Sequence, residues 1–267
     1  MTDPTTLHHP RILCLHGGGT NAHIFRLQCR VLEKRLSHSF RLVYAQAPFP
    51  SLEPGPDVAS VYKDHGPFRV WLRDHRMPGV WTLRDVVAGI DGALALAMAA
   101  DDAMGATGEW VGLLGFSQGA KVAGSVLYRQ QRCGGTGFRF AVLIAGRGPL
   151  VWLMPDLPLP RGLVDAATPF THPTPAWLTL GGDEHVLRLR TVHVHGLRDP
   201  GLESHRELLR EYCDPGQAAV VEWEGEHRMP IRSRDVEMVV QQIRKAAGET
   251  GMEMEMEMPE LRRGGWR

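Results

Sequence analysis

The sequence carries no excess of either charge, no long apolar run and few cysteines. Lysine plus arginine and aspartate plus glutamate each number 30, so the chain has no overall field to hold nucleic acid or an acidic membrane by counterion release. No window approaches the roughly 18 apolar residues of a membrane helix, and residues 1–11 lack the order of a signal peptide. We therefore expect a soluble, cytoplasmic protein with neither a nucleic-acid nor a membrane partner.

Motifs for metals, phosphates and dinucleotides are missing as well. The four cysteines are scattered without a CxxC spacing, and four in a chain of this length do not make a disulfide scaffold. There is no HExxH motif and no P-loop, and the glycines at 17–19 lack the GxGxxG spacing of a dinucleotide site. The sequence therefore predicts no metal and no other cofactor.

Short apolar runs do alternate with segments of helical periodicity along most of the chain. At 267 residues the chain is long enough to bury one sizeable core, and we expect one domain over 1–248 followed by a disordered Met/Glu-rich tail over 249–267. Strands are predicted at 11–15, 42–45, 110–114, 140–144, 191–195 and 218–223, and helices at 24–36, 83–104, 120–132, 202–212 and 235–247. This alternation predicts an α/β fold whose mostly parallel sheet is covered by helices on both faces.

One pentapeptide carries the clearest chemistry. Residues 115–119 read Gly-Phe-Ser-Gln-Gly, the G-x-S-x-G pattern of a nucleophile elbow, in which a sharp strand-to-helix turn exposes the serine. The competing interpretation is an ordinary turn with an idle serine. An apolar strand directly before the motif and a helix rich in small residues directly after it favour the elbow, so Ser117 is the predicted nucleophile.

A serine hydroxyl needs a base to remove its proton, and elbow folds supply an acid and then the base later in the chain. Asp199 follows an apolar strand, and His227 lies in a loop between the last strand and the last helix. Asp183 is a rival acid, but a helix follows the strand before Asp199 in the expected order. His185 and His195 are weaker candidates for the base, since each precedes or abuts the acid.

The oxyanion of a tetrahedral intermediate also needs backbone donors. One is predicted to be the N–H of Gln118, the residue after the nucleophile. The other is predicted in the glycine-rich loop after the first strand, at Gly18, with Gly19 as the alternative. A plain glycine-rich turn is the competing interpretation of that loop.

Several motifs together resemble the fungal serine hydrolase (FSH) family, from the first strand to the last helix. They are Leu-His-Gly-Gly-Gly-Thr-Asn at 15–21, Tyr-Ala-Gln-Ala-Pro at 44–48, the elbow at 115–120, Val-His-Gly-Leu-Arg-Asp-Pro at 194–200, and Gly225 with His227 and Pro230. Two features depart from the family pattern: Glu226 stands where a second glycine is commoner, and the Met/Glu tail has no counterpart. The resemblance implies a compact α/β-hydrolase.

The resemblance also implies esterase or thioesterase activity, because several family members work beside fungal polyketide synthases. The expected reaction is hydrolysis of an acyl thioester or ester through an acyl-enzyme on Ser117, releasing a polyketide-type chain from an acyl carrier domain in secondary metabolism. The alternatives are a broad carboxylesterase for small esters and a non-catalytic, ligand-binding relative. Phe68, Trp71 and Trp152 lie in irregular segments and are candidates for the acyl pocket, although each alone is more typical of a core.

Overall fold

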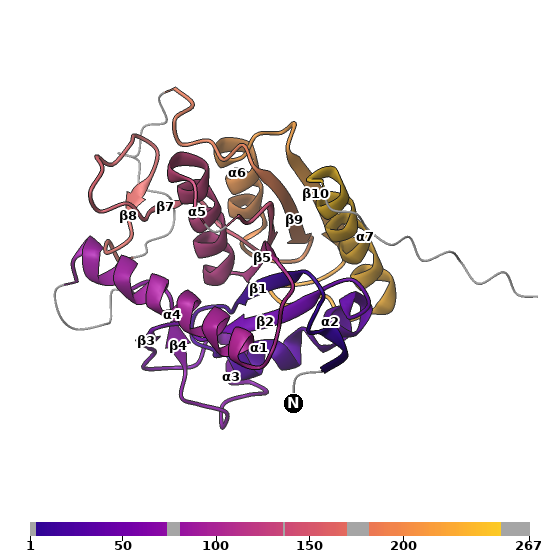
Figure 1. The fold of residues 1–267 in the computed structure, drawn as a ribbon. Helices are drawn as coiled ribbons and strands as arrows, with labels where there is room; N and C mark the ends of the chain where they lie inside the picture. Colours follow the sequence, from indigo (N-terminus) through magenta and orange to yellow (C-terminus); the bar gives the residue numbers. More distant parts are fainter. Residues whose placement is uncertain (1–3, 74–80, 136, 170–181, 252–267) are drawn as a thin grey trace, which may run out of the picture.

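The computed structural model describes residues 4–73, 81–135, 137–169 and 182–251 (Figure 1). A six-stranded sheet runs through the molecule in the order β10-β9-β6-β5-β1-β2, and each pair of adjacent strands is parallel. Its strands are β1 (Arg11–Leu15), β2 (Arg41–Ala45), β5 (Trp110–Phe116), β6 (Phe140–Ile144), β9 (Arg190–Gly196) and β10 (Ala218–Trp223). Every strand expected from the sequence is present, with ends displaced by at most two residues.

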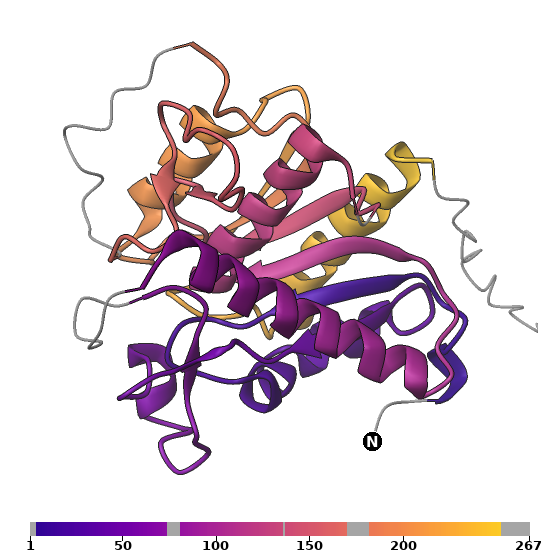
Figure 2. The same cartoon turned by 60° about the vertical axis from the view of Figure 1, so that its left-hand side comes forward.

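Helices cover both faces of this sheet (Figures 1 and 2). The side chains of β1 alternate, as a pleated strand requires: Leu13 and Leu15 belong to one buried cluster, and Ile12 and Cys14 to the other. The first cluster includes residues of α4 (Leu83–Ala103), α5 (Gln118–Cys133) and α6 (Leu202–Tyr212), and the second includes residues of α1 (Ala22–Gln28), α2 (Arg30–Leu36) and α7 (Ser233–Glu249). The predicted α/β architecture is confirmed.

Two details differ from the expectations. The helix predicted over 24–36 is divided at Cys29 into α1 and α2, and Asn21 caps α1 by accepting a hydrogen bond of 2.8 Å from the Ile24 N–H. Glu249, assigned to the tail, is the last residue of α7, whereas 252–267 lie outside the described residues. Among the described helices, none has the length and apolar character that crossing a bilayer requires.

The irregular segments contain short elements that periodicity did not predict. They are a 3₁₀ turn (Pro4–Thr6), the one-turn helix α3 (Pro56–Ala59), the antiparallel pair β3 (Phe49–Pro50) and β4 (Arg69–Val70), and the parallel pair β7 (Val151–Trp152) and β8 (Val164–Asp165). Strands of two residues have no periodicity to detect. β4 matters for function, because it pairs with the loop after β1 through a bridge between Thr20 and Arg69.

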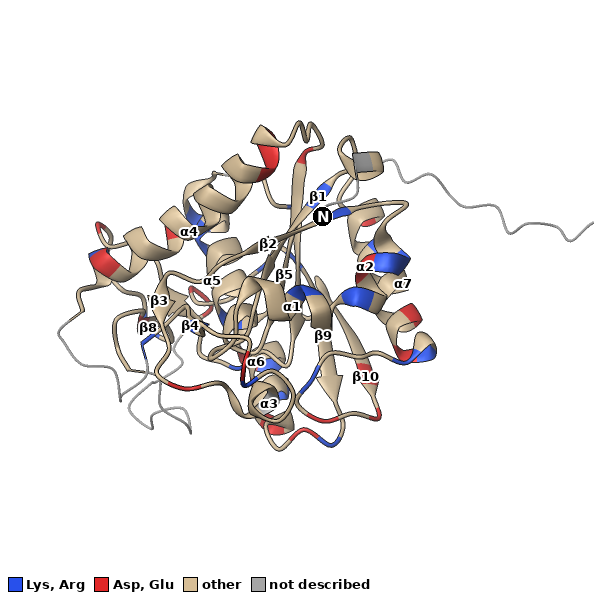
Figure 3. Cartoon of the chain, turned by 90° about the horizontal axis from the view of Figure 1, so that it is seen from below, with Lys and Arg blue, Asp and Glu red and all other residues tan. Residues whose placement is uncertain are grey.

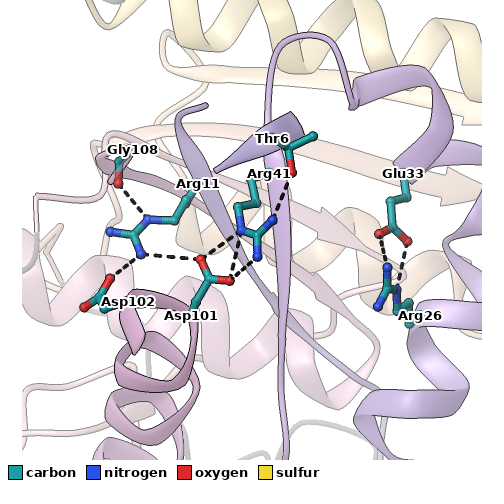
Figure 4. A network of polar contacts seen from close by, with 8 residues as sticks. All are labelled: Thr6, Arg11, Arg26, Glu33, Arg41, Asp101, Asp102 and Gly108. Carbon is teal, nitrogen blue, oxygen red and sulfur yellow. Dashed lines mark hydrogen bonds and ion pairs between the residues drawn. The ribbon is translucent and has the colours of Figure 1, made fainter. Parts of the chain in front are cut away.

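A charged network lies at the amino ends of β1 and β2 (Figure 4). Asp101, near the end of α4, is 1% exposed and accepts from Arg41 at 2.6 to 3.0 Å and from Arg11 at 3.4 Å. Arg11 also pairs with Asp102 and donates to the Gly108 carbonyl at 2.6 Å. The network ties the end of α4 to the sheet edge opposite the strand carboxyl ends. Elsewhere acidic and basic residues are interspersed (Figure 3).

Candidate active site

The first site residue lies at the carboxyl end of β5, where the chain turns sharply into α5. Ser117 adopts φ 53° and ψ −114°, a strained conformation for a residue with a side chain, and its N–H donates to the Ile144 carbonyl at 2.8 Å. A Cβ on Gly115 would overlap the Gly119 carbonyl oxygen, and a Cβ on Gly119 would overlap that of Leu15. Glycine on both sides of the serine is therefore a steric requirement of this turn.

Two further loops bring an imidazole and a carboxylate to Ser117. His227 follows β10, and its Nε2 lies 3.0 Å from Ser117 Oγ. Asp199 follows β9, and its Oδ2 accepts from His227 Nδ1 at 2.6 Å. Because a carboxylate only accepts, Nδ1 carries the proton and Nε2 is free to accept from the serine hydroxyl. β5, β9 and β10 are all parallel, so their carboxyl ends meet at one edge of the sheet.

Asp199 is held as a carboxylate by the groups around it. Burial raises the pKa of this carboxyl, but hydrogen bonds from His227 and from the Gly201 N–H, the latter at 2.7 Å, outweigh burial, so its pKa lies below the ordinary value. His205 is fully buried beside it, with Nε2 at 3.7 Å from Asp199 Oδ2. The carboxylate is thus suited to orient the imidazole and to stabilise its protonated form.

The rival residues occupy other environments. Asp183 has a largely exposed side chain that pairs with Arg188, and the segment before it, 170–181, lies outside the described residues. His185 is buried with Nε2 at 2.9 Å from the Glu211 carbonyl. His195 is a buried strand residue in β9. The structure therefore places Asp199, and not Asp183, against the imidazole that contacts Ser117.

The two predicted oxyanion donors lie beside Ser117 and line the same cavity. The Gln118 N–H belongs to the first turn of α5, where backbone donors lack intrahelical partners. Gly18 lies against the Gln118 side chain: a Cβ added to this glycine would lie only 3.3 Å from Cδ of Gln118. The alternative donor, the Gly19 N–H, already donates to the Arg69 carbonyl at 2.9 Å. The structure therefore favours Gly18 over Gly19 as the predicted donor from this loop.

The side chain of Gln118 has a separate role that sequence reasoning missed. Its Oε1 accepts from the Trp71 N–H at 2.7 Å and from the Leu72 N–H at 3.3 Å, and its Nε2 donates to the Leu72 carbonyl at 3.3 Å. Trp71 Nε1 also donates to the His16 carbonyl at 2.9 Å. The elbow, the glycine-rich loop and the segment after β4 are thus bonded into one unit.

The three aromatic residues predicted to line the acyl pocket do not line the cavity beside Ser117. Trp71 is 0% exposed and is committed to the contacts just described. Trp152 is 2% exposed and donates Nε1 to the Leu157 carbonyl at 3.2 Å. Phe68 is half-buried and is not among the residues that line this cavity. Both tryptophans are core residues, because they belong to the buried cluster that also contains Leu13 and Leu15.

The cavity itself has a volume of about 790 Å³ and contains Ser117 and His227. Beyond the predicted residues, it is lined by charged side chains, among them Lys121, Arg147, Arg198, Glu53 and Glu226. Lys121 lies four residues after the nucleophile, so the helical i, i+4 spacing would have placed it on the nucleophile's face of α5. No local sequence signal identifies Arg147, which lies in the loop after β6.

Asp199, His205 and His227 also place one potential ligand atom each within 4.8 Å of one another, a spacing compatible with a metal ion. Two of these atoms already share the hydrogen bond between the carboxylate and the imidazole. A metal there would have to displace the Nδ1 proton of His227 and would break the contact that orients the base. The arrangement fits acid–base chemistry on a serine better than metal binding.

The chain is similar to known proteins over most of its length. A family model described as "Serine hydrolase (FSH1)" matches residues 4–239. The chain is 57% identical over 261 residues to Esterase dbaE of Emericella nidulans, covering 92% of this chain and 94% of that protein. It is 53% identical over 268 residues to Esterase pigG of Monascus ruber, covering 94% and 96%. TT1662 from Thermus thermophilus shares the fold, with a TM-score of 0.50 at 18% identity over 92% of this chain and 91% of that one.

Proposed function

This chain belongs to the FSH1 serine hydrolase family and is a serine hydrolase of the esterase type, and we propose how it works. Its catalytic triad consists of Ser117, His227 and Asp199. The observation that carries the proposal is the pair of contacts made by His227, 3.0 Å to Ser117 Oγ and 2.6 Å to Asp199 Oδ2. The base lies within hydrogen-bonding distance of the nucleophile on one side and of the orienting acid on the other, which is the arrangement that acyl transfer by a serine requires.

The reaction follows from this geometry. His227 Nε2 takes the hydroxyl proton as Ser117 Oγ attacks the acyl carbonyl, and the N–H groups of Gly18 and Gln118 stabilise the oxyanion. The imidazolium then donates its proton to the departing alcohol or thiol, which leaves an acyl-enzyme. Water repeats the cycle with His227 as base and releases the acid. Removing one such oxyanion donor typically costs about 3 kcal/mol of transition-state stabilisation.

We further propose that the acyl group is a polyketide-type chain, delivered as a thioester by an acyl carrier domain. Three observations support this choice. The relatives named esterases cover nearly the whole chain, and the motifs resemble a family with members that work beside polyketide synthases. The cavity of about 790 Å³ has room for an acyl group much larger than acetate.

Labelling with a fluorophosphonate probe tests the triad. Intact mass should show one adduct, peptide mapping should place it on Ser117, and Ser117→Ala should abolish it. Ser51→Ala is the matched control, because Ser51 lines the same cavity but donates to the Glu53 carbonyl at 2.7 Å and should leave labelling unchanged. A folded wild-type protein without an adduct would favour the non-catalytic, ligand-binding alternative.

Hydrolysis of matched substrates tests the acyl donor. A long acyl chain is presented as a carrier-domain thioester, as an N-acetylcysteamine thioester and as an oxygen ester, and kcat/KM is compared. A preference for the carrier-bound thioester is expected. Equal or faster turnover of short oxygen esters would identify a broad carboxylesterase instead.

A further inference from the structure

A buried histidine adjoins the glycine-rich loop and has no part in the triad. His16 directly follows β1, is 0% exposed, and is not among the residues that line the cavity around Ser117. Its Nδ1 lies 2.7 Å from the carbonyl oxygen of Gly17, and its Nε2 lies 3.1 Å from the backbone nitrogen of Ala47. Both ring nitrogens are therefore engaged by backbone groups, which come from two different segments of the chain.

These two partners fix the position of the proton on the ring. A carbonyl oxygen only accepts, so Nδ1 of His16 carries a hydrogen and donates it to Gly17. A backbone N–H only donates, so Nε2 presents its lone pair to Ala47. Burial lowers the pKa of His16 to about 4, although the hydrogen bond to Gly17 opposes this effect, so the ring is neutral near pH 7. A single neutral tautomer satisfies both contacts.

The hydrogen bond from Nδ1 reaches the peptide unit that carries a predicted oxyanion donor. The Gly17 carbonyl and the Gly18 N–H belong to one planar trans peptide, in which the two groups point in opposite directions. The carbonyl points to the buried imidazole of His16, so the N–H points the other way. Gly18 lines the cavity beside Ser117, whereas Gly17 and His16 do not. Fixing the carbonyl therefore fixes the direction of the Gly18 N–H.

Glycine gives this peptide little orientational preference of its own. The angles that set its plane, ψ of Gly17 and φ of Gly18, belong to residues without a Cβ, and glycine adopts positive and negative φ about equally. The preceding peptide is anchored from elsewhere, because Trp71 Nε1 donates to the His16 carbonyl at 2.9 Å. Among the described residues, the hydrogen bond to the Gly17 carbonyl comes from His16 alone. Without that bond the peptide would be able to turn over and present its carbonyl, instead of its N–H, to the cavity.

We propose that His16 is a positioning residue of the oxyanion site, which holds the Gly17–Gly18 peptide so that the Gly18 N–H faces the acyl oxygen. This inference rests on the proposed function and adds to it a residue that acts on the transition state without touching the substrate. The glycines permit a close approach of the backbone to the substrate, and the imidazole supplies the rigidity that the glycines lack. Preorganised donors are effective because they need no reorganisation during the reaction.

Two substitutions separate the two hydrogen bonds of this imidazole. Asparagine places its amide nitrogen near the position of Nδ1, so His16→Asn keeps a donor to the Gly17 carbonyl and loses the acceptor for Ala47. Glutamine places its amide group near the position of Nε2, so His16→Gln keeps an acceptor for Ala47 and loses the donor to Gly17. His193→Gln is the matched control, because His193 is a histidine of β9 that is 1% exposed and does not line the cavity.

Hydrolysis of a p-nitrophenyl ester is measured as kcat per folded molecule, with folded protein determined by near-ultraviolet circular dichroism. His16→Gln should lower kcat about 10²- to 10³-fold, the usual effect of losing one oxyanion donor, with KM nearly unchanged, because the donor acts mainly on the transition state. His16→Asn should remain within about tenfold of wild type, and His193→Gln should match wild type. Equal kcat values in the Asn and Gln variants, as a merely structural role predicts, or a His16→Gln kcat within about tenfold of wild type, would overturn the proposal.

A measurement on the wild-type protein without substrate keeps this inference distinct from the proposed function. In ¹⁵N-histidine-labelled protein at pH 7, nitrogen NMR shows which ring nitrogen carries the proton. The His16 signal, identified by its loss in His16→Asn, should report a protonated Nδ1 and an unprotonated Nε2. A protonated Nε2 would overturn the proposal at any level of activity. Absent fluorophosphonate labelling of Ser117 would instead refute the triad, and it would not alter the tautomer of His16.

Discussion

Acidification should destabilise this protein through four buried histidines. Burial lowers the pKa of His16 and His195 to about 4, and that of His193 and His205 to about 3, from an ordinary value of 6.5. All four are at most 1% exposed. Below pH 6.5 the unfolded chain binds a proton at each of these positions and the folded chain does not, so stability is lost as the pH falls from 6.5 to about 4 for His16 and His195 and to about 3 for His193 and His205.

The magnitude follows from proton linkage. Between pH 7.5 and pH 5.5 each histidine removes about 1.4 kcal/mol of unfolding free energy, and the four together remove on the order of 5 kcal/mol. This loss is comparable to the total stability of about 5–15 kcal/mol of an ordinary domain. Carboxylates with ordinary pKa values titrate below this window, so they contribute little to the change.

Urea unfolding at pH 7.5 and 5.5, at constant ionic strength and followed by circular dichroism, measures the effect. The midpoint should fall at pH 5.5 with little change in the slope of free energy against urea. His193→Gln should reduce the pH-dependent difference by about 1.4 kcal/mol, whereas His38→Gln should not, because His38 is exposed. A total difference below about 1 kcal/mol would refute the reasoning.

Three further predictions concern the site and its support. Asp199→Asn removes the charge that orients the imidazole and should lower kcat for ester hydrolysis about 10³- to 10⁴-fold with little change in Tm; a kcat within tenfold of wild type would contradict the assigned role. Gly119→Ala should destabilise the fold by at least about 3 kcal/mol in urea titrations, because its Cβ would overlap the Leu15 carbonyl oxygen. Gly92→Ala, in α4 with open space around it, is the control and should stabilise by up to about 1 kcal/mol; similar effects of the two changes would refute the steric argument. Asp101→Asn leaves two buried arginines without their shared carboxylate and should lower the unfolding free energy by about 3–5 kcal/mol, and a loss below 1 kcal/mol would show that the network contributes little.

The fold and the family were accessible from the sequence because their signals are local. Each strand of the main sheet is a short apolar run, and the elbow is a pentapeptide in which the glycines at 115 and 119 are required by overlaps with nearby backbone. The predicted resemblance is confirmed by the family match over residues 4–239. The candidate acid and base followed from chain order, because parallel strands bring the loops at their carboxyl ends to one edge.

Other features of the site were decided only by tertiary contacts. Trp71 is a core residue because its indole reaches the His16 carbonyl, 55 positions away in the chain. The Gly19 N–H donates to the Arg69 carbonyl of β4, which favours Gly18 over Gly19 as the predicted oxyanion donor. Arg147 comes from a loop without any recognisable motif and lines the nucleophile's cavity beside Lys121. Sequence periodicity reports which face of an element is buried, but the partner of a loop side chain depends on which distant segments the packed sheet brings beside it.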